Sequence, residues 1–507
     1  MRELTNLGDL LDIATPRTSP ALIDCRDWEN PRTLTHGDIE QQVHACARAL
    51  KASGLDRGDR VAILSLNRAE FVIAYLAVMR AGLVAVPANI KFPRETIAFI
   101  LEDSRVRLAF CDATGRALLP TGLPTVDFDA SGRESFSSFL DPGSFESVRP
   151  QPGEAAMVLY TSGSTGRPKG VLLSHDGHLW AVRSRVGAGG HNRHRILVAA
   201  PLFHMNALGL TKFAIAAGAC MVLLPQFNAR RYVEAIGRFK VTWVTSVPTM
   251  LTLALREREA VAHTDLSSVE IIRAASAPVA QSLVDEVRQL FPNATLNIGY
   301  GTTEAGPVMF GPRPGVPKSD LSLGWPLPGV EVRLVGPDGQ ETRDGELWIR
   351  TPANMTEYLN LPEKTKEVLT SEGWYKSGDI FRCDGTGAYT FVGRVDDMFV
   401  CGGENIYPGE VESMLERHAD VVQACVVPVP DDIKGAKPFA FVVPRPGAQL
   451  TQDGVKRFAL EHAPAYQHPR VVVFVSELPL ATTNKIDRKE LGRIARERWS
   501  ASERTKA

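Results

Sequence analysis

The sequence has few cysteines, spaces them widely, and contains no long block of one charge. Its seven cysteines are odd in number and never form a CxxC pair, which argues against a Cys-based zinc site and favours a reducing compartment. Lysine and arginine total 57 against 58 aspartate and glutamate residues, a formal net charge of -1. Nothing in this charge pattern indicates a nucleic-acid partner.

Long apolar stretches are also missing. The N-terminus carries acidic residues and lacks an apolar signal core, and the most apolar internal run, 213–224, is too short to span a bilayer. These absences predict a soluble cytoplasmic protein without a membrane span.

The pattern of the chain is that of an α/β protein with more than one domain. At 507 residues it exceeds what one compact core supports. Short apolar strands alternate with amphipathic helices from about residue 22 to 110, as in a strand at 60–66 and a helix at 69–81, which predicts layered α/β sheets. Beyond Gly315, short β segments predict a small barrel-like subdomain, and the last hundred or so residues predict a separate small α/β domain.

The clearest motif is the stretch 160–171, which reads YTSGSTGRPKGV. Glycines let backbone N–H groups approach an anion, hydroxyl side chains add donors and a lysine adds a point charge, so the loop suits a polyphosphate. It is not a Walker A loop, because Pro168 stands five residues beyond Gly163, and not a nucleophile elbow, because Ser162 replaces the first glycine. The residues assigned to phosphate are Thr161, Ser162, Gly163, Ser164, Thr165, Gly166 and Lys169.

This stretch resembles the phosphate-loop signature of the acyl-adenylate-forming, or AMP-binding, enzyme family, of the AMP-forming acyl-CoA synthetase and aryl-CoA ligase type. A second segment, LNIGYGTTEAG at 296–306, is similar to the family's adenine and metal segment. Tyr300 offers a flat face to a purine, and Glu304 offers a carboxylate to Mg²⁺, with Thr161 as a second candidate on the metal side. The further nucleotide contacts that the resemblance implies are Ala275, Gly301, Thr302 and Thr303.

The resemblance extends over nearly the whole chain and implies its domain organisation. Residues 1–394 would form a large N-terminal domain of layered α/β sheets plus a small β-barrel, 395–397 a hinge at Asp396, and 398–507 a small mobile α/β lid domain. Asp379 and Arg394 correspond to the family's ribose-binding pair, because a carboxylate accepts hydrogen bonds from a diol. Lys485 corresponds to the terminal catalytic lysine, although Asn484 precedes it where many members have glycine.

By the same resemblance, the acyl pocket would be lined mostly by uncharged residues. Such a lining favours an aryl or medium-chain acid over a dicarboxylate. The implied pocket residues are His204, which would face the carboxylate, and Met205, Asn206, Ala275, Tyr300 and Met309. The implied contacts to coenzyme A and its pantetheine arm are Gly402, Gly403, Glu404, Tyr466 and His468.

The function implied by the resemblance is a two-step ligase. ATP and Mg²⁺ would convert a carboxylic acid into an acyl-adenylate with release of pyrophosphate, and coenzyme A would accept the acyl group. The expected catalytic residues are Lys485, His204, Glu304 and Thr161. Two alternatives stay open: a stand-alone adenylation enzyme that loads a carrier protein, and a nucleotide-binding ATPase or switch. The expected partners are a small carboxylic acid and coenzyme A, without nucleic acid, and a homodimer is left open.

Overall fold

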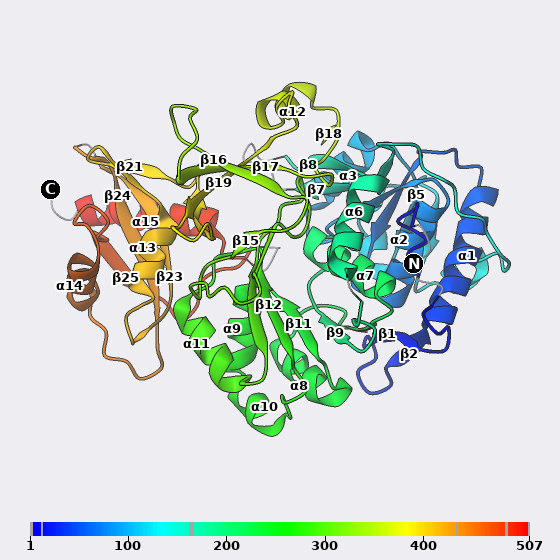
Figure 1. Ribbon diagram of the computed structural model, residues 1–507, viewed down its shortest axis with the longest axis horizontal. Coiled ribbons are helices and arrows are strands. Elements are labelled where there is room, and N and C mark those ends of the chain that lie inside the picture. Colours follow the sequence, from blue (N-terminus) through cyan, green and yellow to red (C-terminus); the bar gives the residue numbers. More distant parts are fainter. Residues whose placement is uncertain are drawn as a thin grey trace.

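The computed structural model describes residues 4–11, 14–161, 167–187, 189–431, 433–481 and 485–504. Figure 1 shows a large part, coloured from blue to yellow-green, and a smaller part, coloured orange to red, beside it. This confirms the expected mixed α/β fold with a large N-terminal and a small C-terminal domain. None of the described helices combines the length and the apolar character that crossing a bilayer requires.

The first large sheet carries the strands on either side of the predicted phosphate loop. Its central strands are parallel, while the two at one edge, β8 and β18, are antiparallel. Parallel strands are covered on both faces, which explains continuous apolar runs such as the VAIL of β3. The strand order is β18 (Glu357–Tyr358), β8 (Lys169–Ser174), β7 (Ala155–Thr161), β4 (Val84–Pro87), β3 (Arg60–Leu64), β5 (Val106–Cys111) and β6 (Thr125–Asp127).

The second large sheet is completed by the beginning of the chain, since β1 pairs in parallel with the much later β10. The parallel strands β12 and β13 end in register at Ala275 and Gly299, so the segments that follow them emerge at the same edge of the sheet, where α/β folds bind ligands. The strand order is β13 (Thr295–Gly299), β12 (Ile271–Ala275), β11 (Trp243–Ser246), β9 (Arg195–Val198), β10 (Cys220–Leu223), β1 (Pro20–Asp24) and β2 (Arg32–Thr35).

Two apolar helices share one core with residues of both sheets. Every residue of α2 (Ala69–Arg80) is buried, and so are nearly all of α7 (Met205–Ala216), as expected of helices that are apolar on every side. Helix α6 (His175–Val186) follows the N-cap residue Ser174, whose side chain accepts from the Gly177 N–H. The other helices are α1 (His36–Ala52), α3 (Arg94–Asp103), α4 (Ala113–Arg116), α5 (Phe136–Phe139), α8 (Ala229–Phe239), α9 (Pro248–Arg256), α10 (Arg258–His263) and α11 (Gln281–Leu290).

The β subdomain consists of a four-stranded antiparallel sheet and a two-stranded one, joined by a bridge between Gly324 and Tyr389. Its register places Asp379 opposite Arg394. The larger sheet runs β16 (Glu331–Val335), β17 (Asp344–Arg350), β19 (Tyr375–Cys383) and β20 (Tyr389–Arg394), and the smaller one pairs β14 (Phe310–Gly311) with β15 (Trp325–Pro326). Helix α12 (Pro362–Val368) follows β18.

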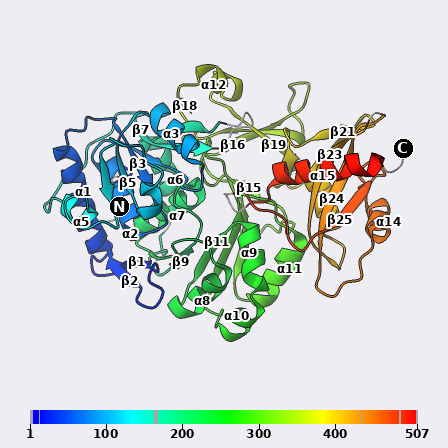
Figure 2. The ribbon, with the colours of Figure 1, turned by 180° about the vertical axis from the view of Figure 1, so that it is seen from behind.

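The C-terminal domain, from β21 onward, has one sheet with helices on its two faces. Helices α13 (Pro408–Leu415) and α14 (Gln452–His462) cover one hydrophobic cluster, and α15 (Arg488–Arg504) covers the other. Figure 2 shows α15 lying across β23 from behind. The strands are β21 (Phe399–Cys401), β22 (Glu404–Ile406), β23 (Val421–Asp431), β24 (Gly435–Pro444) and β25 (Val471–Phe474). The predicted domain boundary falls in a turn between β20 and β21, and it stays a prediction.

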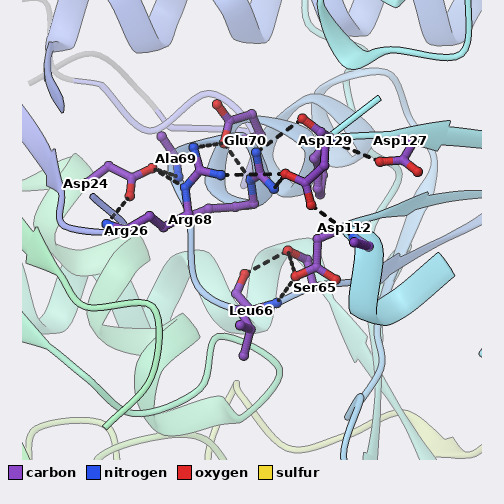
Figure 3. A network of polar contacts seen from close by, with 12 residues as sticks. Asp24, Arg26, Ser65, Leu66, Arg68, Ala69, Glu70, Asp112, Asp127 and Asp129 are labelled. Atoms are coloured by element: carbon purple, nitrogen blue, oxygen red, sulfur yellow. Dashed lines mark hydrogen bonds and ion pairs between the residues drawn. The ribbon is translucent and has the colours of Figure 1, made fainter. Parts of the chain in front are cut away.

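A polar network ties the two large sheets together at the start of α2 (Figure 3). Arg68 donates to Glu70 at 2.7 Å and to Asp129, beyond β6, at 2.6 Å. The Ala69 N–H donates at 3.1 Å to Asp24, at the end of β1. Arg68 and Glu70 are both buried, so each depends on the other to offset the cost of leaving water.

The network predicts that Arg68→Met destabilises the N-terminal domain. The change keeps most of the apolar stem but leaves the buried Glu70 with less positive charge, which costs about 3 kcal/mol for a broken buried pair. Urea unfolding followed by tryptophan fluorescence measures the shift. The control is Arg230→Met, which removes an exposed pair with Glu234 and should leave the midpoint unchanged. Equal midpoints for both variants would contradict the role of the network.

Candidate active site

One cavity of about 2350 Å³ lies where the two large sheets, the β subdomain and the C-terminal domain meet. Residues that are far apart in the sequence line it together. The predicted site residues on its wall are Thr161, Lys169, His204, Met205, Asn206, Ala275, Tyr300, Gly301, Thr302, Thr303, Glu304, Asp379, Arg394, Asp396 and Lys485.

The predicted phosphate loop connects two antiparallel strands, with Thr161 of β7 opposite Lys169 of β8. Ser162, Gly163, Ser164, Thr165 and Gly166 lie outside the described residues. The Lys169 Nζ lies 4.4 Å from the centre of the Tyr358 ring. Burial lowers the pKa of Lys169, and the nearby carboxylate of Glu304 partly offsets this.

Tyr358 also connects this strand pair to the predicted metal carboxylate, because its hydroxyl donates to Oε1 of Glu304 at 3.0 Å. Tyr358 lies on β18, which pairs with β8. Sequence reasoning missed it, since a tyrosine in a short strand segment has no distinguishing pattern. The tyrosine thus orients Glu304 and contacts Lys169 at once.

The predicted adenosine residues form a hydrogen-bonded cluster. Tyr300 donates from its hydroxyl to Oδ2 of Asp379 at 2.6 Å, and Arg394 contacts Oδ1 of Asp379 at 2.6 Å. Burial raises the pKa of Asp379 more than Arg394 lowers it. The Tyr300 ring packs edge-on against Phe381, with centroids 4.9 Å apart. These contacts fix the ring of Tyr300 and the carboxyl of Asp379 beside each other on the cavity wall.

Lys485 reaches this cluster from the C-terminal domain. The Ala481 N–H donates to the Lys485 carbonyl at 2.7 Å, and Leu480 forms an antiparallel β-bridge with Ile486. These backbone contacts hold the segment on which Lys485 lies. Its side chain remains accessible from the cavity, yet enclosure by protein lowers its pKa, while Asp379 acts to raise it. The observed orientation of the C-terminal domain therefore places the ammonium group beside the adenosine cluster.

His204 lies at the N-cap position of α7. Its Nε2 is buried and has no hydrogen-bond partner among the described residues. Burial, Lys485 and Lys91 lower the pKa of His204 to about 4. A neutral imidazole with a free nitrogen at the cavity is suited to bind a polar group of a substrate. Two residues on, Asn206 donates to Ser276 at 3.2 Å.

Ser276 follows β12 with a φ of +71°. This left-handed conformation is uncommon for serine and is often found at functional sites. It turns the chain sharply after Ala275, at the sheet edge where the cavity lies.

Some predicted contacts lie away from the cavity. Met309 is fully buried, packs in the hydrophobic core and is not on the cavity wall, so its assignment to the acyl pocket stays a prediction. Gly402, Gly403, Glu404, Tyr466 and His468 are not on the cavity wall either. Gly403 has open space around its Cα. In this lid orientation, these residues of the C-terminal domain do not join the site.

Two charged wall residues, Arg185 of α6 and Arg273 of β12, were also missed from the sequence. In β12, the alternation IIRAA places Arg273 on the face opposite the buried Ile272 and Ala274. The sequence signal that could have identified Arg273 is its position within an otherwise apolar strand.

Comparison with known proteins identifies the family. The model of the AMP-binding enzyme family matches residues 13–359, and that of the AMP-binding enzyme C-terminal domain matches residues 410–485. A 4-coumarate–CoA ligase from Solanum tuberosum is 32% identical over 496 residues, which cover 93% of this chain and 90% of that protein.

Solved structures of similar proteins support the same family assignment. The structure of an anthranilate CoA ligase in complex with anthranoyl-AMP is 28% identical with a TM-score of 0.87, and the match covers 98% of each chain. An o-succinylbenzoate CoA synthetase from Bacillus subtilis, in complex with its acyl-adenylate intermediate, is 28% identical with a TM-score of 0.79, covering 94% of this chain and 96% of that one. The chain therefore belongs to the AMP-binding enzyme family and is an AMP-forming acid–thiol ligase.

Proposed function

We propose that this enzyme activates an aryl carboxylic acid with ATP and transfers the acyl group to coenzyme A. The observation that carries the proposal is the position of Lys485, which extends from the C-terminal domain into the same cavity as Glu304, Asp379 and His204. The names of the relatives, ligases of 4-coumarate and anthranilate, support an aryl acid and coenzyme A as substrates.

In the first step, a carboxylate oxygen of the acid bonds to the α-phosphorus of ATP as the bond to the bridging oxygen breaks and pyrophosphate leaves. His204 Nε2 faces the carboxylate, and Lys485 neutralises charge that develops between the carboxylate and the α-phosphate. Thr161 and Lys169 hold the outgoing phosphates. Tyr300 orients the adenine, and Asp379 with Arg394 orients the ribose.

Glu304 is the residue that would hold Mg²⁺, which, when bound, offsets the charge of the phosphates. Mg²⁺ is commonly held by one or two carboxylates together with substrate phosphates, and Glu304 keeps Oε2 available while Oε1 accepts from Tyr358. Within the described ranges, no group of three or more histidine, cysteine or acidic side chains forms a metal site. The residues present therefore fit a phosphate-linked ion rather than a protein cage.

In the second step, the thiol of coenzyme A gives up its proton and its sulfur bonds to the acyl carbon. The bond from that carbon to the phosphate oxygen breaks, and AMP leaves. We place a rotation of the lid about Asp396 before this step, because Gly402, Gly403 and Glu404 lie off the cavity while Lys485 occupies it. The rotation would withdraw Lys485 and bring the glycine turn to the cavity, where the missing side chains leave room for a pantetheine arm. Tyr466 and His468 would then contact the nucleotide of coenzyme A.

The first prediction separates the two steps. Lys485→Met should slow acid-dependent pyrophosphate release by about 10²- to 10³-fold, because a preorganised charge is lost. Thioester formation from a supplied acyl-adenylate should stay within a few-fold of the wild-type rate. Rapid-quench measurement of each half-reaction tests this, and equal losses in both would contradict the alternating lid. Phosphate release without any acid would instead favour a simple ATPase.

Gly403→Leu should show the opposite pattern, with adenylation retained and thioester formation slowed by about 10²-fold, since a small displacement of reacting groups has an effect of that size. Gly403 has a φ of +91°, so any side chain adds backbone strain. The matched control is Gly447→Leu, at another open turn of the same domain with a φ of +82°. If both variants turn over normally, the pantetheine assignment is wrong.

The pH dependence of adenylation follows from the two shifted groups. Because His204 has a pKa of about 4, it stays neutral and should contribute no inflection between about pH 6 and pH 8. The pKa of Lys485 is lowered from 10.5, so activity should fall at high pH before an ordinary lysine would lose its proton. Lys485→Arg, which keeps its positive charge, should shift the alkaline fall in activity to higher pH. If that fall stays at the same pH, the ionising group is not Lys485.

A further inference from the structure

Two arginines on the wall of the active-site cavity have no carboxylate partner within the part of the chain that the structure describes. Arg185 and Arg273 are half-buried residues that line this cavity. Arg185 donates to the carbonyl of Gly209 at 3.2 Å, and its guanidinium carbon lies 4.7 Å from the centre of the Phe213 ring. Neither the carbonyl nor the ring carries a negative charge that could balance the guanidinium.

Arg273 has still fewer contacts. Burial alone lowers the pKa of Arg273 to about 10, and no acidic neighbour among the described residues raises it. A Cβ on Gly299, across the sheet on β13, would lie 2.6 Å from Arg273 Nε. Because residue 299 is a glycine, the guanidinium has room to lie over the sheet.

The surroundings of the pair are basic as well. Burial and the charge of Arg273 lower the pKa of Arg185 to about 9. Burial and Arg185 lower the pKa of the buried Lys212 to about 7, and its Nζ contacts Nδ1 of His178 and the sulfur of Met157. Positive charge therefore accumulates here without an anion from the described part of the protein.

Buried arginines elsewhere in the protein are paired with carboxylates. Arg68 is paired with Glu70 and Asp129, and Arg80 donates to both oxygens of Glu40 at 2.9 and 3.0 Å. Partly desolvated charge without a partner is costly. Two neighbouring guanidinium groups that face a cavity therefore form a site prepared for an anion that comes from solution.

The pair lies away from the carboxylate that is adenylated. His204 stands at the N-cap of α7, whereas Arg185 donates to the carbonyl of Gly209, within the same helix. Five residues of α-helix separate His204 from Gly209, a rise of about 7.5 Å along the axis. An acid whose carboxylate lies at His204 would thus extend its other end toward Arg185 and Arg273.

We propose that Arg185 and Arg273 bind a second carboxylate, at the far end of the acid substrate. Planar guanidinium groups pair with carboxylates through two parallel hydrogen bonds, which gives direction as well as affinity. The proposal rests on the proposed function and specifies its substrate class as aryl acids with a distal carboxylate. The pocket is therefore charged at its end, in contrast to the uncharged lining expected from the sequence.

The test compares two acids of the same skeleton, 4-carboxycinnamate and 4-methylcinnamate. Calorimetric titration of the full-length enzyme, with α,β-methylene-ATP present, measures binding without requiring turnover. The wild type should bind 4-carboxycinnamate at least about tenfold more tightly. Arg273→Met should weaken this binding by about 10- to 100-fold, the value of a charge-assisted hydrogen bond, and leave 4-methylcinnamate within about threefold.

Three further variants complete the design. Arg273→Lys keeps a cation and should retain part of the preference for the dianion. Arg185→Gln tests the other arginine of the pair independently, and it replaces Arg273→Met in the comparison if that variant does not fold. Arg193→Met removes an exposed arginine that is paired with Glu270 outside the cavity, and it should change neither affinity.

The outcomes separate this proposal from the proposed function. Equal affinities of the wild type for the two acids, or an unchanged preference in both Arg273→Met and Arg185→Gln, would overturn the anion site. Acid-dependent pyrophosphate release, measured separately with both acids, reports on the ligase reaction. Tight, arginine-dependent binding without that release would support the anion site and contradict the proposed function.

Discussion

Charge that leaves water must be matched by opposite charge, and this constraint shapes the protein from its scaffold to its active site. In the network around Arg68, the protein itself provides the opposite charges, and the same contacts join the two sheets. In the cavity, Arg394 balances the charge of Asp379 only in part, since burial still raises the pKa of Asp379. In the proposed complexes, groups of the substrates balance the charges of Lys485 and the arginine pair and fill the hydrogen-bonding capacity of His204. Binding sites occur where the scaffold leaves charge or hydrogen bonds unmatched.

The cavity also explains why so many separate elements are needed. The phosphate strands belong to one sheet, the segments after β12 and β13 to the other, and Asp379 and Arg394 to the β subdomain. Each element is rigid through its own core, so the side chains at its end keep a fixed direction. A polyphosphate and an acid can therefore be aligned by residues that are distant in the sequence.

In the proposed reaction, the C-terminal domain supplies the charge of Lys485, which is withdrawn before the second step. Its own two hydrophobic clusters, one on each face of the sheet, hold it together as a unit. A domain with this internal stability can rotate without unfolding. Under the proposal, the same domain presents Lys485 for adenylation and the glycine turn for thioester formation.

By itself, the sequence determined the chemistry and most of the local structure. The motif YTSGSTGRPKGV suits a polyphosphate by its residue types. Its resemblance to the family's signature, together with GYGTTE, Asp379, Arg394 and Lys485, indicates an adenylate-forming enzyme. Hydrophobic periodicity placed strands such as β3 and helices such as α2 close to their observed bounds, because period and burial follow from local geometry.

Only the tertiary structure decided which side chains meet. Tyr358 reaches Glu304 because β18 pairs with β8, and Met309 packs in the hydrophobic core. Arg185 and Arg273 become neighbours because a helix and a strand from different parts of the chain face one cavity. Strand alternation tells on which face a residue lies, but the packing of sheets and helices decides what lies opposite. A sequence pattern does not contain that information.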